Sequence, residues 1–106
     1  MAERNYADFV APLPHPGEHL AADFMPDYGL SAGDLAKAMG LSDRTRIERL
    51  VRGRQAVSAD TALRLARVFG TTPDFWLNLQ AAHDLSKAAI AQRAELKAIK
   101  RLKPAA

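Results

Sequence analysis

The sequence predicts an all-α fold of five helices followed by a C-terminal helical extension. Residues that favour helix N-termini stand before several segments whose apolar residues recur every three or four positions. Gly or Pro residues separate these segments, at points where a helix ends or the chain turns. No segment shows the apolar and polar alternation that is typical of a β-strand, so no strand is expected.

The chain is expected to start with an irregular arm over residues 1–14, which contains two prolines and shows no clean period. A helix is then predicted from Pro16, with Leu20 and Phe24 on its apolar side. Pro26 is predicted to end this helix, because proline lacks the N–H group that a helix interior needs.

Two short helices around a tight turn are predicted between residues 30 and 54. In the first, Ser31 stands at the N-cap, Asp34 returns the capping hydrogen bond, and Gly40 ends the helix. The second is predicted to begin at Ser42. Its apolar residues are Ile47, Leu50 and Val51. This is the layout of a helix-turn-helix DNA reader, whose second helix enters the major groove.

Two more helices are expected after this pair. Ser58 caps the fourth helix and Gly70 ends it, and Thr72 with Pro73 begins the fifth. The apolar stripe predicted for the fourth helix is Ala62, Leu65, Ala66 and Phe69. Residues 85–103 contain neither Gly nor Pro and have high helix propensity, which predicts further helix.

Composition limits the class of protein. A chain of 106 residues forms one domain, which we divide into the arm (1–14), a helix-turn-helix domain (15–85) and a helical extension (86–106). The absence of cysteine excludes disulfides and thiolate metal sites. No signal peptide or membrane-spanning apolar run stands out, which favours a cytoplasmic protein without a membrane partner.

Positive charge begins where the second helix of the pair begins. Residues 1–42 carry six acidic and two basic residues, whereas the balance is +4 over residues 43–73 and +3 over residues 74–106. A cluster of charged residues usually marks a helix face that is exposed to solvent. Here, however, five arginines between residues 44 and 54 favour contact with DNA. Glu48 has an arginine four residues away on either side and is expected to pair with one of them.

The outward face of the second helix supplies the candidate DNA-reading residues. At about 100° per residue, Thr45 and Arg49 point most directly away from the apolar stripe, with Arg46 beside them. These three are the candidates for base contacts, because arginine can reach guanine O6 and N7 through two hydrogen bonds. The candidates for phosphate contacts are Ser31, Ser42, Arg44, Arg52 and Arg54. For any single arginine, a solvated side chain remains the alternative.

The histidines could suggest a metal site or a general base. The Pro-Gly pair after His15 places this residue before the helix, so that its ring need not share a face with His19, and no third ligand lies near in sequence. A capping or structural role is the stronger interpretation, as it is for His83. No catalytic motif stands out. We therefore expect no catalytic residue, metal or cofactor, and no enzyme activity.

Three parts of the chain resemble the HigA antitoxins of the lambda-repressor-like (XRE) helix-turn-helix group: His15-Pro-Gly-Glu18, the helix pair, and above all the segment from Asp60 to Leu85. The resemblance covers about residues 12–85 and implies a lambda-repressor-like domain. It also implies a homodimer that binds a palindromic operator, represses its own operon and silences a RelE-like toxin that cleaves mRNA on the ribosome.

Apolar bulk on more than one side of the fifth helix predicts a dimer interface. Its residues are Phe75, Trp76, Leu77 and Leu79. A RelE-like toxin should be basic, so the acidic N-terminal section is an electrostatic match for it. The acidic residues are Glu3, Asp8, Glu18, Asp23 and Asp27. Two alternatives stay open: a helix-turn-helix regulator without a toxin partner, and a protein-interaction module that uses the basic face against an acidic partner.

Overall fold

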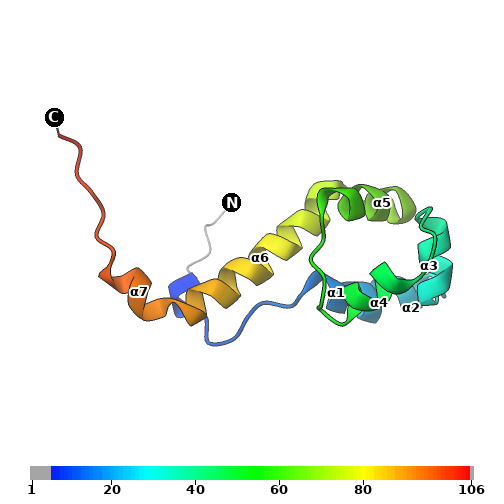
Figure 1. Ribbon diagram of the computed structural model, residues 1–106, viewed down its shortest axis with the longest axis horizontal. Helices are drawn as coiled ribbons and strands as arrows, with labels where there is room; N and C mark the ends of the chain where they lie inside the picture. Colours follow the sequence, from blue (N-terminus) through cyan, green and yellow to red (C-terminus); the bar gives the residue numbers. More distant parts are fainter. Residues whose placement is uncertain (1–5, 106) are drawn as a thin grey trace.

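The computed structural model describes residues 6–105 and shows an elongated molecule of 56 × 29 × 24 Å (Figure 1). Helices α1 to α5 and the start of α6 form a compact body, and α6 leads away from it towards α7 and the C-terminus (Figure 1). No strand occurs among these residues, and the all-α prediction is confirmed. Within the same residues, no helix is both long and apolar enough to cross a membrane.

A continuous helical run begins at Pro16. It consists of α1 (Pro16–His19), the π-helical turn η2 (Leu20–Phe24) and α2 (Met25–Asp27). The prediction that Pro26 ends the helix is therefore wrong. At the end of η2, the Met25 N–H donates to the Leu20 carbonyl five residues back, which shifts the hydrogen-bond ladder just before the proline. Pro26 then lies in the first turn of α2, directly after the π-helical turn, and the run continues to Asp27.

Helix α3 (Ala32–Ala38) has the N-terminus that the sequence predicted. The Ser31 Oγ accepts from the Asp34 N–H at 3.1 Å, and the Asp34 carboxylate accepts from the Ser31 N–H at 3.0 Å. Gly40 follows the helix with a φ of 73°, in the left-handed region that glycine adopts without strain. Both predicted ends of this helix are confirmed.

Helix α4 (Thr45–Val51) begins later than predicted. The prediction that Ser42 starts it is wrong: Arg44 stands at the N-cap without a side-chain cap bond, and Asp43 Oδ1 accepts from the Thr45 N–H at 2.8 Å in the turn before the helix. Ser42 lies in the turn instead.

Helices α5 (Ala59–Phe69) and α6 (Pro73–Ala91) have the predicted boundaries where they meet. The hydroxyls of Ser58 and Thr72 each accept a backbone N–H three residues on, and Gly70 separates the two helices with a φ of 72°. The caps and the turn are confirmed.

The core lies between α5 and the helices that precede it. Its buried residues include the whole predicted stripe of α5, so that prediction is confirmed. The largest fully buried aliphatic and aromatic side chains are Leu20, Leu35, Ile47, Leu50, Leu65 and Trp76. The ring of Phe24 packs against Phe69 and Trp76, with centroid distances of 5.0 and 4.9 Å. These aromatic contacts fasten η2 to α5 and α6.

Helix α6 continues without a break past residue 85. It ends at Ala91, and a short helix α7 (Arg93–Ala98) follows after Gln92. The predicted helix over residues 85–103 is thus confirmed as far as residue 98, apart from this interruption, and is wrong for residues 99–103. Residues 99–105 are all exposed, so burial adds no support to helix propensity there.

The part of the arm that the structure describes, residues 6–14, is bound to α6 and to Arg93, which follows it. The Leu13 N–H donates to the Ser86 Oγ at 2.8 Å, and the Leu13 carbonyl accepts from the His83 Nδ1–H at 2.7 Å. Nearer the N-terminus, the guanidinium of Arg93 donates to the Phe9 carbonyl. One turn of 3-10 helix, η1 (Tyr6–Asp8), forms within the arm.

Candidate nucleic-acid interface

One side of α4 is buried and the other is open to solvent. Ile47 and Leu50 are fully buried, whereas Thr45 and Arg49 are exposed. Successive residues differ by about 100° around a helix, so burial of the first pair directs the second pair outward. The structure places both of these predicted residues on the open face. Their contact with bases stays a prediction.

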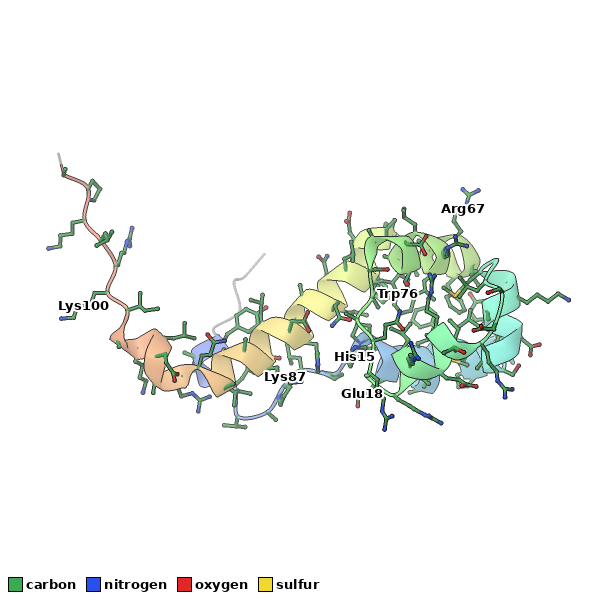
Figure 2. All side chains as sticks on the ribbon, viewed as in Figure 1. His15, Glu18, Arg67, Trp76, Lys87 and Lys100 are labelled. Atoms are coloured by element: carbon green, nitrogen blue, oxygen red, sulfur yellow. The ribbon has the colours of Figure 1, made fainter. Side chains whose placement is uncertain are left out.

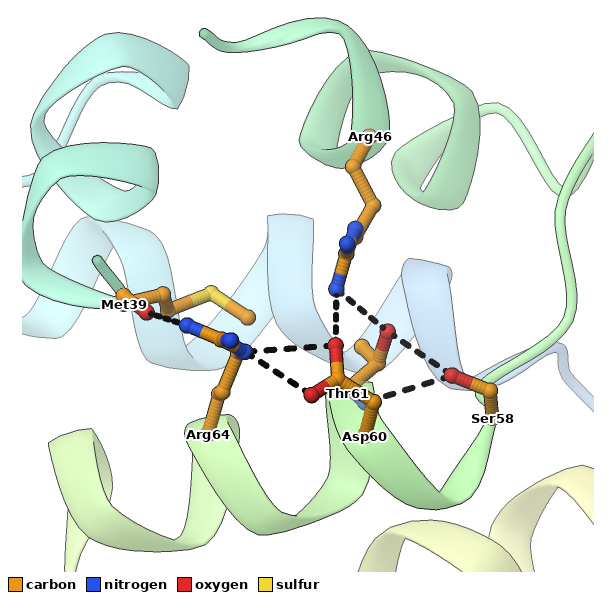
Figure 3. A network of polar contacts seen from close by, with 6 residues as sticks. All are labelled: Met39, Arg46, Ser58, Asp60, Thr61 and Arg64. Atoms are coloured by element: carbon orange, nitrogen blue, oxygen red, sulfur yellow. Dashed lines mark hydrogen bonds and ion pairs between the residues drawn. The ribbon is translucent and has the colours of Figure 1, made fainter. Parts of the chain in front are cut away.

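Arg46 is placed differently from the other predicted base-contact residues. Its guanidinium turns towards α5, where Nη1 donates to Asp60 Oδ2 at 2.6 Å and lies 3.5 Å from the Thr61 hydroxyl (Figure 3). In this ion pair the Arg46 guanidinium is directed at Asp60 of the same chain and not at DNA. Asp60 lies 14 residues further along, so helical periodicity gave no signal of this contact.

Asp60 connects three helices of the body. Besides Arg46 of α4, it accepts from the Arg64 Nε at 3.0 and 3.2 Å, and Arg64 Nη1 donates to the Met39 carbonyl at the end of α3 (Figure 3). Hydrogen bonds from the Arg46 and Arg64 guanidinium groups lower the pKa of the Asp60 carboxyl. This network holds α4 against both α3 and α5.

Two of the predicted phosphate-contact residues lie next to the outward face. Arg52 and Arg54 line a shallow hollow of about 360 Å³ together with Thr45 and Arg49. A cluster of arginine side chains on one surface creates a positive potential that attracts phosphate. The structure thus brings together the cations that follow α4 and the two residues that point out from it.

Of the remaining phosphate candidates, Ser42 and Arg44 lie in the turn between α3 and α4, whereas Ser31 stands at the N-cap of α3. Arg44 pairs with Glu48 at 2.7 Å and stays largely exposed, which confirms that Glu48 has an arginine partner. Ser42 and Arg44 line a second hollow with Lys37 of α3. Hydrogen bonds from the Thr45 backbone and side chain lower the pKa of Asp43.

The predicted dimer residues of α6 do not all reach the surface. Trp76 is fully buried in the core of its own chain, and its indole Nε1–H donates to the Thr71 hydroxyl at 2.8 Å, so assigning it to a dimer interface is wrong. The aromatic rings of η2 and α5 cover it, a contact between segments far apart in sequence. Leu77 and Leu79 are half-buried against the core, and Phe75 is 38% exposed.

Histidines hold the arm and the first helix in place. His15 caps α1, as predicted: its Nδ1 accepts from the Gly17 N–H at 2.9 Å. Burial, together with the ring of His83 at 5.0 Å, lowers the pKa of His15. In Figure 2 its side chain lies where α1 approaches α6. Among the described residues, no group of three or more His, Cys, Asp or Glu side chains could hold a metal ion.

The prediction from sequence did not single out two buried polar residues, Gln80 and Ser86. The Gln80 Oε1 accepts from the Val57 N–H at 2.8 Å, and the Ser86 hydroxyl accepts from the arm. Both lie on α6. Gln80 stands between apolar residues in the sequence, which was the available signal, whereas Ser86 precedes Lys87 and gave no such signal. Each accepts a backbone N–H of a segment that passes over α6: Gln80 helps to position the loop between α4 and α5, and Ser86 helps to position the arm.

Comparison with known proteins agrees with this geometry. The family described as helix-turn-helix matches residues 27–76, which run from the end of α2 into α6. Virulence-associated protein I of Dichelobacter nodosus is 48% identical over 77 residues, which cover 73% of this chain and 70% of that protein.

Two solved structures share the fold over most of the chain. Antitoxin GraA in complex with its operator has a TM-score of 0.82 and 39% identity, covering 97% of this chain and 100% of that one. Pseudomonas aeruginosa antitoxin HigA, solved with the higBA promoter, has a TM-score of 0.80 and 35% identity, covering 86% of this chain and 99% of that one.

Proposed function

The chain belongs to the HigA-type antitoxins of the XRE helix-turn-helix family, and on this premise we propose that it binds operator DNA as a homodimer, represses its own operon and neutralises a RelE-like mRNA-cleaving toxin. The observation that carries the proposal is the exposed face of α4. There Thr45 and Arg49 point outward, and Arg52 and Arg54 lie beside them.

Base recognition is assigned to the outward face of α4. In a helix-turn-helix protein the N-terminal part of the second helix meets base edges in the major groove. The Arg49 guanidinium can donate two hydrogen bonds to one guanine, which gives about 1–3 kcal/mol of discrimination. Thr45 stands one turn earlier and can add a polar or methyl contact. Arg46 is left out of this group, since its guanidinium bonds to Asp60.

Phosphate contacts are assigned to the groups around this face. Arg44, Arg52 and Arg54 are exposed and can neutralise phosphates without reading sequence. Ser31, at the N-cap of α3, and Ser42, in the turn before α4, are assigned as neutral donors. The Ser31 oxygen already accepts from Asp34, and its hydroxyl hydrogen is left for a phosphate oxygen.

The dimer interface is assigned to the exposed part of α6, now without Trp76. Phe75 and Leu79 line a hollow of about 350 Å³ with Leu13 and Pro14 of the arm. Two-fold pairing of this apolar surface would bury it and set two copies of α4 to face two half-sites. Leu77, also on α6, is partly buried against the core, and its exposed part is assigned to the same interface.

The toxin surface is assigned to the acidic N-terminal section, apart from the outward face of α4. Asp8, Glu18, Asp23 and Asp27 are exposed, while Glu3 lies outside the described residues. A protein that binds and cleaves mRNA needs cations at its own surface, and carboxylates opposite them favour association. With separate surfaces, the chain can hold the toxin and remain on its operator.

Titration against DNA from upstream of the chain's own reading frame tests the proposal, with a shuffled duplex of equal length and composition as control. We expect tighter binding to the native duplex at matched salt. Co-expression with the neighbouring reading frame, scored by cell growth, tests the antitoxin role. Equal affinity for both duplexes, or growth inhibition that the chain does not relieve, would refute the corresponding part.

A further inference from the structure

The C-terminal tail, residues 97–103, is a strongly basic segment outside the helix-turn-helix. It contains Lys97, Lys100, Arg101 and Lys103 and no acidic residue. All seven residues are exposed, and the last helix ends within the segment, at Ala98. In Figure 2 the side chain of Lys100 extends from the chain beyond α7, clear of the body. Four cations without an acid in seven residues repel one another unless a polyanion neutralises them.

The spacing of these residues argues for a partner that needs charge without a fixed geometry. If the tail continued the helix at about 100° per residue, its cations would spread over an arc of about 160°, and Lys103 would fall between the directions of Leu96 and Ile99. No clean apolar face would result, so the pattern is not that of a membrane-surface helix. A row of phosphates, by contrast, is neutralised by cations on a flexible chain.

The tail lies too far from α4 to contact the same DNA half-site. The tail and α4 lie towards opposite ends of a molecule 56 Å long (Figure 1). That length corresponds to about 16 base pairs of duplex at 3.4 Å per pair. We propose that residues 97–103 bind the phosphate backbone of double-stranded DNA outside the half-site occupied by α4 of the same chain. The inference rests on DNA being the partner proposed above, and adds a sequence-independent contact to it.

The test compares two double variants that each remove one lysine and one arginine. Lys100→Ala/Arg101→Ala neutralises the tail, and Arg67→Ala/Lys87→Ala removes the same charge from exposed positions on α5 and α6 (Figure 2). Affinity is measured across a salt series on a duplex trimmed to the operator and on a duplex with about 30 flanking base pairs on each side, long enough to exceed the reach of the tail.

On the long duplex, the tail variant should lose about two from the slope of log affinity against log salt, and the control variant should keep the slope. On the trimmed duplex, both variants should behave like the natural chain. The same loss of slope on a long random duplex supports the tail contact even if α4 shows no operator preference, which separates this inference from the proposed function. An unchanged slope on the long duplex, equal losses from both variants, or a loss confined to single-stranded RNA or anionic vesicles would overturn it.

Discussion

Gly17 lies so close to Leu50 that a Cβ added to the glycine would stand 1.8 Å from the leucine carbonyl oxygen. The contact brings the first turn of α1 against the end of α4. The Gly17 N–H is also the group that His15 caps. The position of the helix assigned to DNA reading therefore depends on a residue without a side chain in a different helix.

Gly17→Ala should lower the free energy of unfolding by about 2–4 kcal/mol, because the obstructing atom belongs to the backbone and α4 must move to admit a methyl group. Urea denaturation measures this change. Gly33→Ala is the matched control: its nearest neighbour would be the Ser31 Oγ at 3.9 Å, and it should stabilise α3 by about 0.5–1 kcal/mol. Similar stabilities for the two variants would contradict the close approach.

Arg49→Ala and Arg54→Ala should weaken DNA binding in different ways. Loss of a base contact should lower affinity for the operator and relax preference at one base pair per half-site, whereas loss of a phosphate contact should weaken binding to operator and random DNA alike. Titrations on both duplexes across a salt series separate the two, because each lost phosphate contact removes about one from the salt slope. Sequence-blind losses from both variants would refute the assignment.

Phe75→Ala and Trp76→Ala should separate association from folding. Phe75 is partly exposed on α6, so its truncation should shift the equilibrium from dimer to monomer while the chain stays folded. Trp76 is fully buried, so its truncation should cost about 3–5 kcal/mol of stability. Sedimentation and thermal unfolding measure the two effects. A natural chain that sediments as a monomer at micromolar concentration, with or without DNA, would refute the dimer.

Asp60→Asn should lower stability near neutral pH and have little effect at pH 2. The pKa of Asp60 is lowered by Arg46 and Arg64 in the folded chain, so its ionised form is stabilising above the unfolded pKa of about 4, and this stability is lost as pH falls through the folded value. Denaturation of both proteins at several pH values checks this. A difference in stability that persists unchanged at pH 2 would show that the ion pairs are not its source.

His15→Asn should flatten the pH dependence of stability below neutral pH. The pKa of His15 is lowered by burial and by His83, so the unfolded chain takes up its proton first, and the free energy of unfolding falls as pH drops below about 6.5. Asparagine can cap α1 with its Oδ1 but does not titrate. Urea denaturation between pH 7.5 and 5 compares the two. Parallel curves would mean that His15 contributes nothing to the dependence.

The features that could be predicted from sequence depend on atoms within about four residues of one another. Ser31 bonds to a backbone group three residues on, and Ser58 and Thr72 do the same, so residue type and spacing predict these helix starts. Burial of Ile47 and Leu50 follows from the helical period, and it turns Arg49 outward. Most of the candidate interface could thus be located before the fold was known.

Tertiary structure decided the features that depend on a distant partner. Arg46 has the residue type and the position of a base reader, but Asp60 on the next helix holds its guanidinium. Trp76 has the bulk of an interface residue, but rings from η2 and α5 cover it. Periodicity shows which way a side chain leaves its own helix. Which charges and apolar surfaces meet it there depends on how the helices pack, because ion pairs and burial are contacts across space.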